Sequence, residues 1–176
     1  METAKKNILI SGLPGIGKTT LIKKLCLEIQ DRHPIGFYTE EIRLEGQRKG
    51  FQLISLNGDR SIFAHVLIES TFRVGKYGVD IKTFDEFLDS IDFQNNQGSP
   101  IVIDEIGKME CLSSKFVKMI WEIMDSDNKV IATISHTDGG IKGKIKERED
   151  VELFKMNLDN RESLLAEILE IVNASN

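Results

Sequence analysis

The chain has 176 residues, of which 40% are hydrophobic and 29% charged, a composition typical of one compact globular domain. A formal net charge of -5 argues against a general nucleic-acid binder or a binder of anionic membranes. Cys26 and Cys111 show no CxxC spacing, and no apolar stretch suits a signal peptide or a membrane span. We therefore expect a single domain over residues 1–176, a reduced cytoplasmic monomer without membrane or nucleic-acid partners.

The first predicted elements are a short buried strand and an amphipathic helix, with a glycine-rich turn between them. Asn7–Ile10 is an apolar run of strand length. Leu21, Leu25 and Ile29 recur every four residues, which predicts a helix over about Lys18–Asp31 that ends before the following proline.

The middle of the chain is rich in β-forming residues. Three segments are expected to be strands, and the glycine-bearing turn LEGQRK joins the first two in a hairpin: Ile35–Ile42, Gly50–Leu56 and Ser61–Ile68. A helix over 84–91 follows, for which Thr83 and Glu86 have the spacing of a capping box.

Strands and helices alternate in the second half of the chain. The expected strands are Ile101–Ile103, Lys129–Ile134 and Val151–Met156, and the expected helices cover Ser113–Met124 and Leu164–Val172. Such alternation predicts an α/β three-layer sandwich, with a mostly parallel central sheet, helices on both faces and the antiparallel hairpin as an insertion.

A phosphate-binding pattern follows the first strand. The segment GLPGIGKT matches GxxxxGK[ST], the P-loop or Walker A motif, and lies between a predicted strand and a predicted helix. Glycines let backbone N–H groups converge on phosphate oxygens, and the helix N-terminus adds positive partial charge. We expect Lys18 to bind the β- and γ-phosphates and the Thr19 hydroxyl to ligate Mg²⁺, although a glycine-rich turn without a ligand is the alternative. The residues of the motif are Gly12, Leu13, Pro14, Gly15, Ile16, Gly17, Lys18 and Thr19.

An acidic pair of Walker B type follows the strand Ile101–Ile103. Asp104 is expected to hold Mg²⁺ through its water shell, and it can face Thr19 because parallel strands share one crevice. Glu105 suits a group that orients or deprotonates an attacking water, which favours hydrolysis; a solvated carboxylate or an ion pair with Lys108 is the alternative. Lys108 either stabilises charge on the leaving phosphates or is a surface lysine.

Several motifs in one order resemble the THEP-type nucleoside-triphosphatase family, also called cancer-related nucleoside-triphosphatase. They are GLPGIGKTTLI, GFYTEEIR, RVGKYGVD, VIDEIGKME and DVELFKMNLDNR, and the resemblance runs almost end to end. It implies slow, magnesium-dependent hydrolysis of ATP, GTP, CTP and UTP or TTP, with little base preference and weaker action on diphosphates. It also implies nucleotide contacts from the P-loop and from a second segment, Ile101, Val102, Ile103, Asp104, Glu105, Ile106, Gly107 and Lys108.

The resemblance leaves some roles unassigned. Ser135–Lys144 departs from the loop of the family, so His136 and a lid function for this loop receive no support from it. An arginine that stabilises charge on the γ-phosphate is expected in many such enzymes, and the alternative for each arginine is a surface ion pair. The candidates are Arg43, Arg73, Arg148 and Arg161, of which Arg148 and Arg73 lead.

Two other functions use the same phosphate-binding residues. A small nucleotide or metabolite kinase would have the same P-loop and Asp104 but would bind an acceptor hydroxyl. A nucleotide-dependent switch or RNA-interacting module is the second alternative, and the net charge of -5 counts against RNA. The predicted function is hydrolysis of nucleoside triphosphates.

Overall fold

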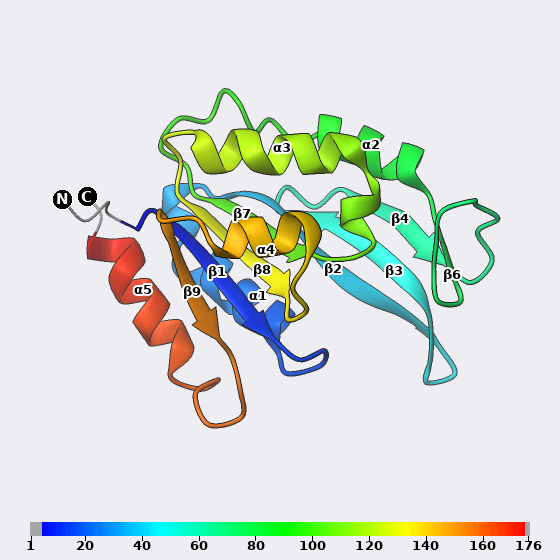
Figure 1. The fold of residues 1–176 in the computed structure, drawn as a ribbon, viewed down its shortest axis with the longest axis horizontal. Coiled ribbons are helices and arrows are strands. Elements are labelled where there is room, and N and C mark those ends of the chain that lie inside the picture. The colour runs from blue at the N-terminus through cyan, green and yellow to red at the C-terminus, as the bar shows by residue number, and fades with distance from the viewer. Residues whose placement is uncertain (1–4, 175–176) are drawn as a thin grey trace.

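The computed structural model describes residues 5–174, and their strands form one nine-stranded sheet (Figure 1). The strands are β1 (Asn7–Gly12), β2 (Ile35–Leu44), β3 (Gln47–Ser55), β4 (Arg60–His65), β5 (Arg73–Val74), β6 (Tyr77–Val79), β7 (Ile101–Ile106), β8 (Val130–Ser135) and β9 (Val151–Lys155). The helices are α1 (Lys18–Glu28), α2 (Ile81–Asp89), α3 (Ser114–Asp125), α4 (Gly140–Lys146) and α5 (Leu164–Ala174), with short 3₁₀ turns at Gln30–Arg32 and Glu110–Leu112.

The sheet has a parallel half and an antiparallel half. Its order is β5-β6-β4-β3-β2-β7-β8-β1-β9, in which β2, β7, β8, β1 and β9 run parallel. Strands β3, β4, β6 and β5 extend it by antiparallel pairs. Because parallel strands point the same way, the segments after β1, β7 and β8 lie together at the carboxyl ends of these strands.

Two hydrophobic layers hold the helices against the sheet. On one face, side chains of α2, α3 and α4 pack on the strands around Phe37, Phe84 and Phe116, all fully buried. On the other face, α1 and α5 pack around Ile8 and Ile10 of β1. Figure 1 shows this arrangement, with α2 and α3 along one side of the sheet and α1 behind it.

The element boundaries correct several sequence-based expectations. The helix α1 ends at Glu28, and the chain to residue 32 continues as a 3₁₀ turn. The expected six-residue turn LEGQRK is only a two-residue turn, because β2 and β3 stay paired as far as Leu44 and Gln47. Glu45 and Gly46 both have positive φ there, the conformation that favours tight hairpin turns.

The predicted capping box at the start of α2 is wrong. This helix begins three residues earlier, at Ile81, and Asp80 is its N-cap, whose carboxylate accepts a hydrogen bond from the Thr83 backbone N–H at 2.9 Å. The Thr83 hydroxyl donates to the same carboxylate at 2.8 Å, so Thr83 stabilises the first turn from within it. Glu86 instead lies near Lys82, with 3.7 Å between their charged atoms.

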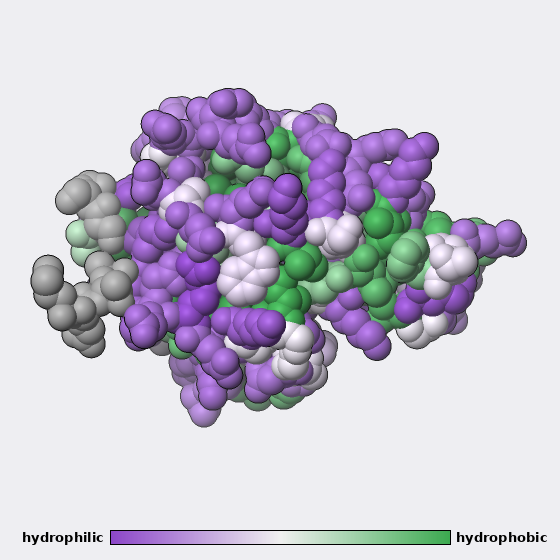
Figure 2. Space-filling view, turned by 45° about the horizontal axis from the view of Figure 1, so that its top comes forward, coloured by the Kyte–Doolittle hydropathy of each residue, from purple (hydrophilic) through white to green (hydrophobic). Residues whose placement is uncertain are grey.

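The face shown in Figure 2 is mainly polar. Hydrophilic residues cover most of the face in Figure 2, and hydrophobic residues gather in its middle and toward its right-hand end. No helix of the described residues has both the length and the apolar character that a membrane crossing requires. Cys26 and Cys111 are free, partly buried thiols, as their spacing predicted.

Candidate functional site

The predicted P-loop joins β1 directly to α1. Gly15 and Gly17 have positive φ values of 78° and 112°, so a side chain at either position would strain the turn. The helix begins at Lys18 immediately after Gly17. The first N–H groups of a helix have no carbonyl partner within it, so this turn presents free donors to an anion.

The Lys18 ammonium is fixed at the mouth of the loop. Its side chain is only 8% exposed, and Nζ donates to the carbonyl oxygens of Gly12 at 2.9 Å and Leu13 at 3.3 Å. Its other neighbour is the Glu105 carboxylate, with 3.6 Å between Nζ and Oε2. Glu105 therefore pairs with the P-loop lysine. The alternative expectation, an ion pair between Glu105 and Lys108, is wrong.

Asp104 lies within β7, which extends beyond the expected strand to Ile106, and is 1% exposed. The Thr19 hydroxyl donates to its Oδ2 at 2.7 Å, and the Thr133 hydroxyl donates to its Oδ1 at 2.5 Å. Sequence analysis missed Thr133, which is on β8, because the strand order was open. Since β8 lies between β7 and β1, the Thr133 side chain reaches Asp104 on the neighbouring strand.

Thr19 and Asp104 offer a hard-oxygen donor pair. Among residues 5–174, no group of three or more His, Cys, Asp or Glu side chains is arranged to hold a metal ion. A metal at Thr19 and Asp104 would thus need water and ligand oxygens to complete its coordination, as Mg²⁺ bound with phosphates usually does. The donor set fits Mg²⁺ in this sense.

Two glutamates meet beneath the site. Burial raises the pKa of Glu105, although the Lys18 ammonium opposes the shift. Glu110, in the 3₁₀ turn after β7, is also buried, and its pKa rises to about 8, mainly because of burial and further because of the nearby Glu105 charge. Gly107 separates them: a Cβ there would lie 2.6 Å from Glu110 Oε2 and 3.0 Å from Glu105 Oε1.

A cavity of about 540 Å³ opens in front of the P-loop. Its lining includes Lys18, Thr19 and Glu105, and it continues to the β2–β3 hairpin at Arg48 and Phe51. Ser135 and His136, from the divergent segment after β8, also line it. The rest of that segment was expected to be a loop, but α4 begins within it at Gly140.

Other predicted contact residues lie away from this cavity. Lys108 is exposed and does not line it, so its role stays a prediction. Ile101, Val102 and Ile103 are fully buried in the sheet, where their side chains position Asp104. Ile106 is also fully buried.

The four candidate arginines separate clearly. Arg43 pairs with Glu41 on the exposed hairpin, and Arg73, on β5, donates to the Lys76 carbonyl in the turn that follows. Arg148 is held by Asp125 and Asp150 and lies over Trp121, beside the start of β9. None of these three lines the cavity. Arg161 borders the other side of the P-loop, and Arg48, missed by the sequence analysis, lines the cavity itself.

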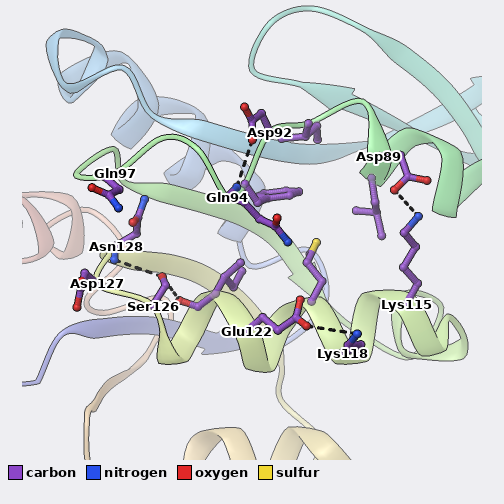
Figure 3. Close-up of a pocket in the computed structure, with 15 residues that line it drawn as sticks. Asp89, Asp92, Gln94, Gln97, Lys115, Lys118, Glu122, Ser126, Asp127 and Asn128 are labelled. Atoms are coloured by element: carbon purple, nitrogen blue, oxygen red, sulfur yellow. Dashed lines mark hydrogen bonds and ion pairs between the residues drawn. The ribbon is translucent and has the colours of Figure 1, made fainter.

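A larger cavity, about 690 Å³, lies elsewhere, between α3 and the segment that follows α2 (Figure 3). Four of its charged side chains form two ion pairs, Lys115 with Asp89 and Lys118 with Glu122. No residue of the P-loop or of β7 lines it. Size alone therefore does not locate the site.

Comparison with known proteins agrees with the motifs. A family model described as NTPase matches residues 7–169. The chain is 47% identical over 166 residues to nucleoside-triphosphatase THEP1 of Thermotoga sp. (strain RQ2), which covers 94% of each chain. It is 34% identical over 186 residues to the human cancer-related nucleoside-triphosphatase, with 97% of this chain and 98% of the relative covered.

Solved structures confirm the predicted α/β fold class. The crystal structure of THEP1 from the hyperthermophile Aquifex aeolicus matches with a TM-score of 0.85 and 36% identity, over 94% of this chain and 98% of that chain. The solution structure of the human cancer-related nucleoside triphosphatase matches with a TM-score of 0.81 and 34% identity, over 97% and 99%. The chain therefore belongs to the NTPase family that includes THEP1 and the cancer-related nucleoside-triphosphatases.

Proposed function

We propose that the protein hydrolyses the terminal phosphate of nucleoside triphosphates. One observation carries this proposal: four polar side chains lie together at the carboxyl ends of the parallel strands, beside the P-loop. They are Lys18, Thr19, Asp104 and Glu105. Thr19 is 2.7 Å from Asp104, and Lys18 is 3.6 Å from Glu105. The names of the related proteins support the same activity.

Substrate binding would use the backbone N–H groups of the P-loop and the Lys18 ammonium. These groups are preorganised, since Lys18 is already held by two loop carbonyls. A triphosphate would replace these carbonyls as partner of the ammonium, and the exchange keeps the buried charge hydrogen-bonded. Thr19 and Asp104 would hold Mg²⁺, which when bound would neutralise charge on phosphate oxygens.

Glu105 would act on the water that attacks the terminal phosphorus. Its raised pKa makes its carboxylate a better proton acceptor than an ordinary glutamate. Its neighbour Lys18 is the group expected at the γ-phosphate, so a water held by Glu105 would lie on the reacting side. Lys108 would contribute only through a change of position, since its side chain is exposed.

The finer properties follow from the family resemblance. We expect magnesium dependence, slow turnover, activity on ATP, GTP, CTP and UTP or TTP, and weaker action on diphosphates. Oxygen-only donors at Thr19 and Asp104 support magnesium.

Phosphate release measured with each of the four ribonucleotides, with Mg²⁺ and with EDTA, tests this function. We expect release from all four with Mg²⁺ only. Glu105→Gln should keep nucleotide binding but slow release by about 100-fold or more, because the amide keeps the shape without the base. Turnover near the wild-type rate in this variant would remove Glu105 from the mechanism.

Phosphoryl transfer to a small acceptor is the second candidate. The cavity of about 540 Å³ is much larger than one water molecule needs, and its hairpin side at Arg48 and Phe51 offers room for another molecule. A panel of nucleosides and monophosphates, incubated with ATP, distinguishes the two. A phosphorylated acceptor in place of free phosphate would favour transfer over hydrolysis.

A further inference from the structure

The P-loop has a second, smaller cavity on its other side. It measures about 220 Å³ and is bordered by Gly15 and Gly17, the same glycines that border the larger cavity. It does not contain Lys18, Thr19 or Glu105. Pockets for drug-sized ligands measure about 300–1,000 Å³, so this cavity suits part of a nucleotide and not a whole one.

The position of the reacting groups orients a triphosphate on the loop. Lys18 and Glu105 face the larger cavity, so the terminal phosphate belongs there if the proposed hydrolysis is correct. If the polyphosphate lies along the N–H groups of the loop, the nucleoside end of the molecule emerges on the opposite side of the loop. That side opens into the smaller cavity, next to the first turn of α1.

The smaller cavity is lined by apolar side chains on one part of its wall and by polar and cationic groups on the rest. Ile16, Leu21, Met156 and Leu165 supply the apolar side chains, from the P-loop, α1, the end of β9 and α5. Lys24 and Arg161 supply the cations. Such a lining suits a flat aromatic ring that lies against methyl and methylene groups beneath a guanidinium.

Besides its cations, this cavity offers the Thr20 hydroxyl and the Glu162 carboxylate as side-chain groups that could contact a base edge. Among the described residues that line it, none has a carboxamide side chain. The carboxylate of Glu162 is already paired with Arg161, at 3.3 Å between Oε1 and Nε. Stacking tolerates any base because every base has a π face, whereas discrimination needs matched hydrogen bonds.

We propose that this cavity, between the P-loop and Arg161, binds the base and ribose of the substrate by stacking and apolar contact. The proposal rests on the proposed function for the direction of the triphosphate. Binding by stacking and apolar contact would explain why the protein accepts different bases. It also gives Arg161 a role at the nucleoside, on the opposite side of the loop from the terminal phosphate.

Two variants alter the cavity in different ways. Leu165→Trp fills it from α5, and Arg161→Ala removes the exposed cation at its rim, which carries little risk for folding because the side chain is 45% exposed. Arg73→Ala is the matched control, since it removes the same charge from β5, at the opposite edge of the sheet from β9. Thermal melting verifies that each variant is folded.

The measurement is calorimetric titration with Mg²⁺ and three probes: the β,γ-imido analogues of ATP and GTP, and inorganic tripolyphosphate. We expect wild-type protein to bind both analogues about tenfold tighter than tripolyphosphate or better, the scale of one stacked base. Leu165→Trp and Arg161→Ala should weaken both analogues and leave tripolyphosphate affinity unchanged. Arg73→Ala should change none of the three.

Three results would overturn the proposal. Equal wild-type affinity for the analogues and tripolyphosphate would show that no nucleoside site exists. An unchanged preference in both cavity variants would place the nucleoside elsewhere, and a parallel loss of tripolyphosphate affinity would assign the cavity to phosphates. Phosphate release is measured separately, so absence of hydrolysis together with the expected affinities would contradict the proposed function alone.

Discussion

Replacement of Glu110 by glutamine should raise the free energy of unfolding relative to wild type by an amount that grows as the pH rises. The carboxyl of Glu110 is buried beneath Gly107, and burial raises its pKa from 4.5 to about 8. The negative charges of Glu105 and Asp104 add to the shift, and the backbone N–H groups of Glu110 and Gly107 partly oppose it. The native protein therefore holds a proton here that the unfolded chain releases.

The sign and size of the effect follow from this difference in bound protons. Between pH 4.5 and about 8 the native state carries one more proton at Glu110 than the unfolded chain, so its contribution to stability falls as pH rises. The slope is about 1.4 kcal/mol per pH unit, which amounts to about 3 kcal/mol from pH 5 to pH 7. Glu110→Gln keeps the shape and an acceptor oxygen but removes this contribution.

Urea unfolding of the nucleotide-free protein at pH 5, 6 and 7 measures the effect. The free energy of unfolding of Glu110→Gln minus that of wild type should grow by about 3 kcal/mol over this range. Glu122→Gln, on the exposed side of α3, controls for the change in net charge. A difference that stays constant from pH 5 to pH 7 would show that Glu110 is ionised in the native state, contrary to the burial argument.

Three further substitutions probe the site. Lys18→Ala should weaken nucleotide binding by about tenfold to a hundredfold, the scale of hydrogen bonds to a charged group; unchanged calorimetric affinity would contradict the proposed phosphate contact. Thr133→Val leaves Asp104 Oδ1 without its 2.5 Å donor, so the Mg²⁺ concentration for half-maximal phosphate release should shift several-fold, and an identical metal titration would count against it. Gly107→Ala places a Cβ 3.0 Å from Glu105 Oε1, so kcat should fall about tenfold or more with KM nearly unchanged, and wild-type kcat would show that Glu105 has room to adjust.

The P-loop and the acidic pair could be found from sequence because each is a local pattern. The spacing from Gly12 to Thr19 fixes a turn and a helix start, and the structure has α1 beginning at Lys18 as that pattern requires. Likewise, an apolar run followed by Asp104 and Glu105 identifies the end of a parallel strand. Such patterns depend on neighbours within a few residues, which a single sequence displays.

The strand boundaries and strand order depend on partners far away in the chain. Strands β2 and β3 extend toward their shared turn because they pair with each other, whereas the composition of the end of β2 and the start of β3 resembles that of a turn. The insertion of β8 between β1 and β7 is a tertiary choice with no local signal. For this reason Thr133, whose hydroxyl contacts Asp104, looked like an ordinary strand residue.

The choice among arginines shows most clearly why the site needed a structure. Arg148 led the sequence candidates, but Asp125 and Asp150 hold it beside the start of β9, at the opposite end of that strand from the P-loop side. Arg48 carries no local signal of a site, because a charged residue beside a hairpin turn usually reflects only solvent exposure. Its guanidinium is instead oriented by the Tyr77 hydroxyl at 3.0 Å and the Glu41 carboxylate at 2.9 Å.

This placement of Arg48 is a consequence of the antiparallel half of the sheet. Arg48 lies on β3 and Tyr77 on β6, with β4 between these strands in the sheet, so their contact exists only once all three are assembled. The ring of Phe51 lies 5.3 Å from the guanidinium carbon and supports it from β3 itself. A guanidinium held by a hydroxyl, a carboxylate and a ring loses little further entropy when an anion arrives. The parallel half of the sheet thus places Lys18, at the start of α1, and Glu105, on β7, at this cavity, and the antiparallel strand β3 supplies Arg48 as a fixed cation in the lining of the same cavity.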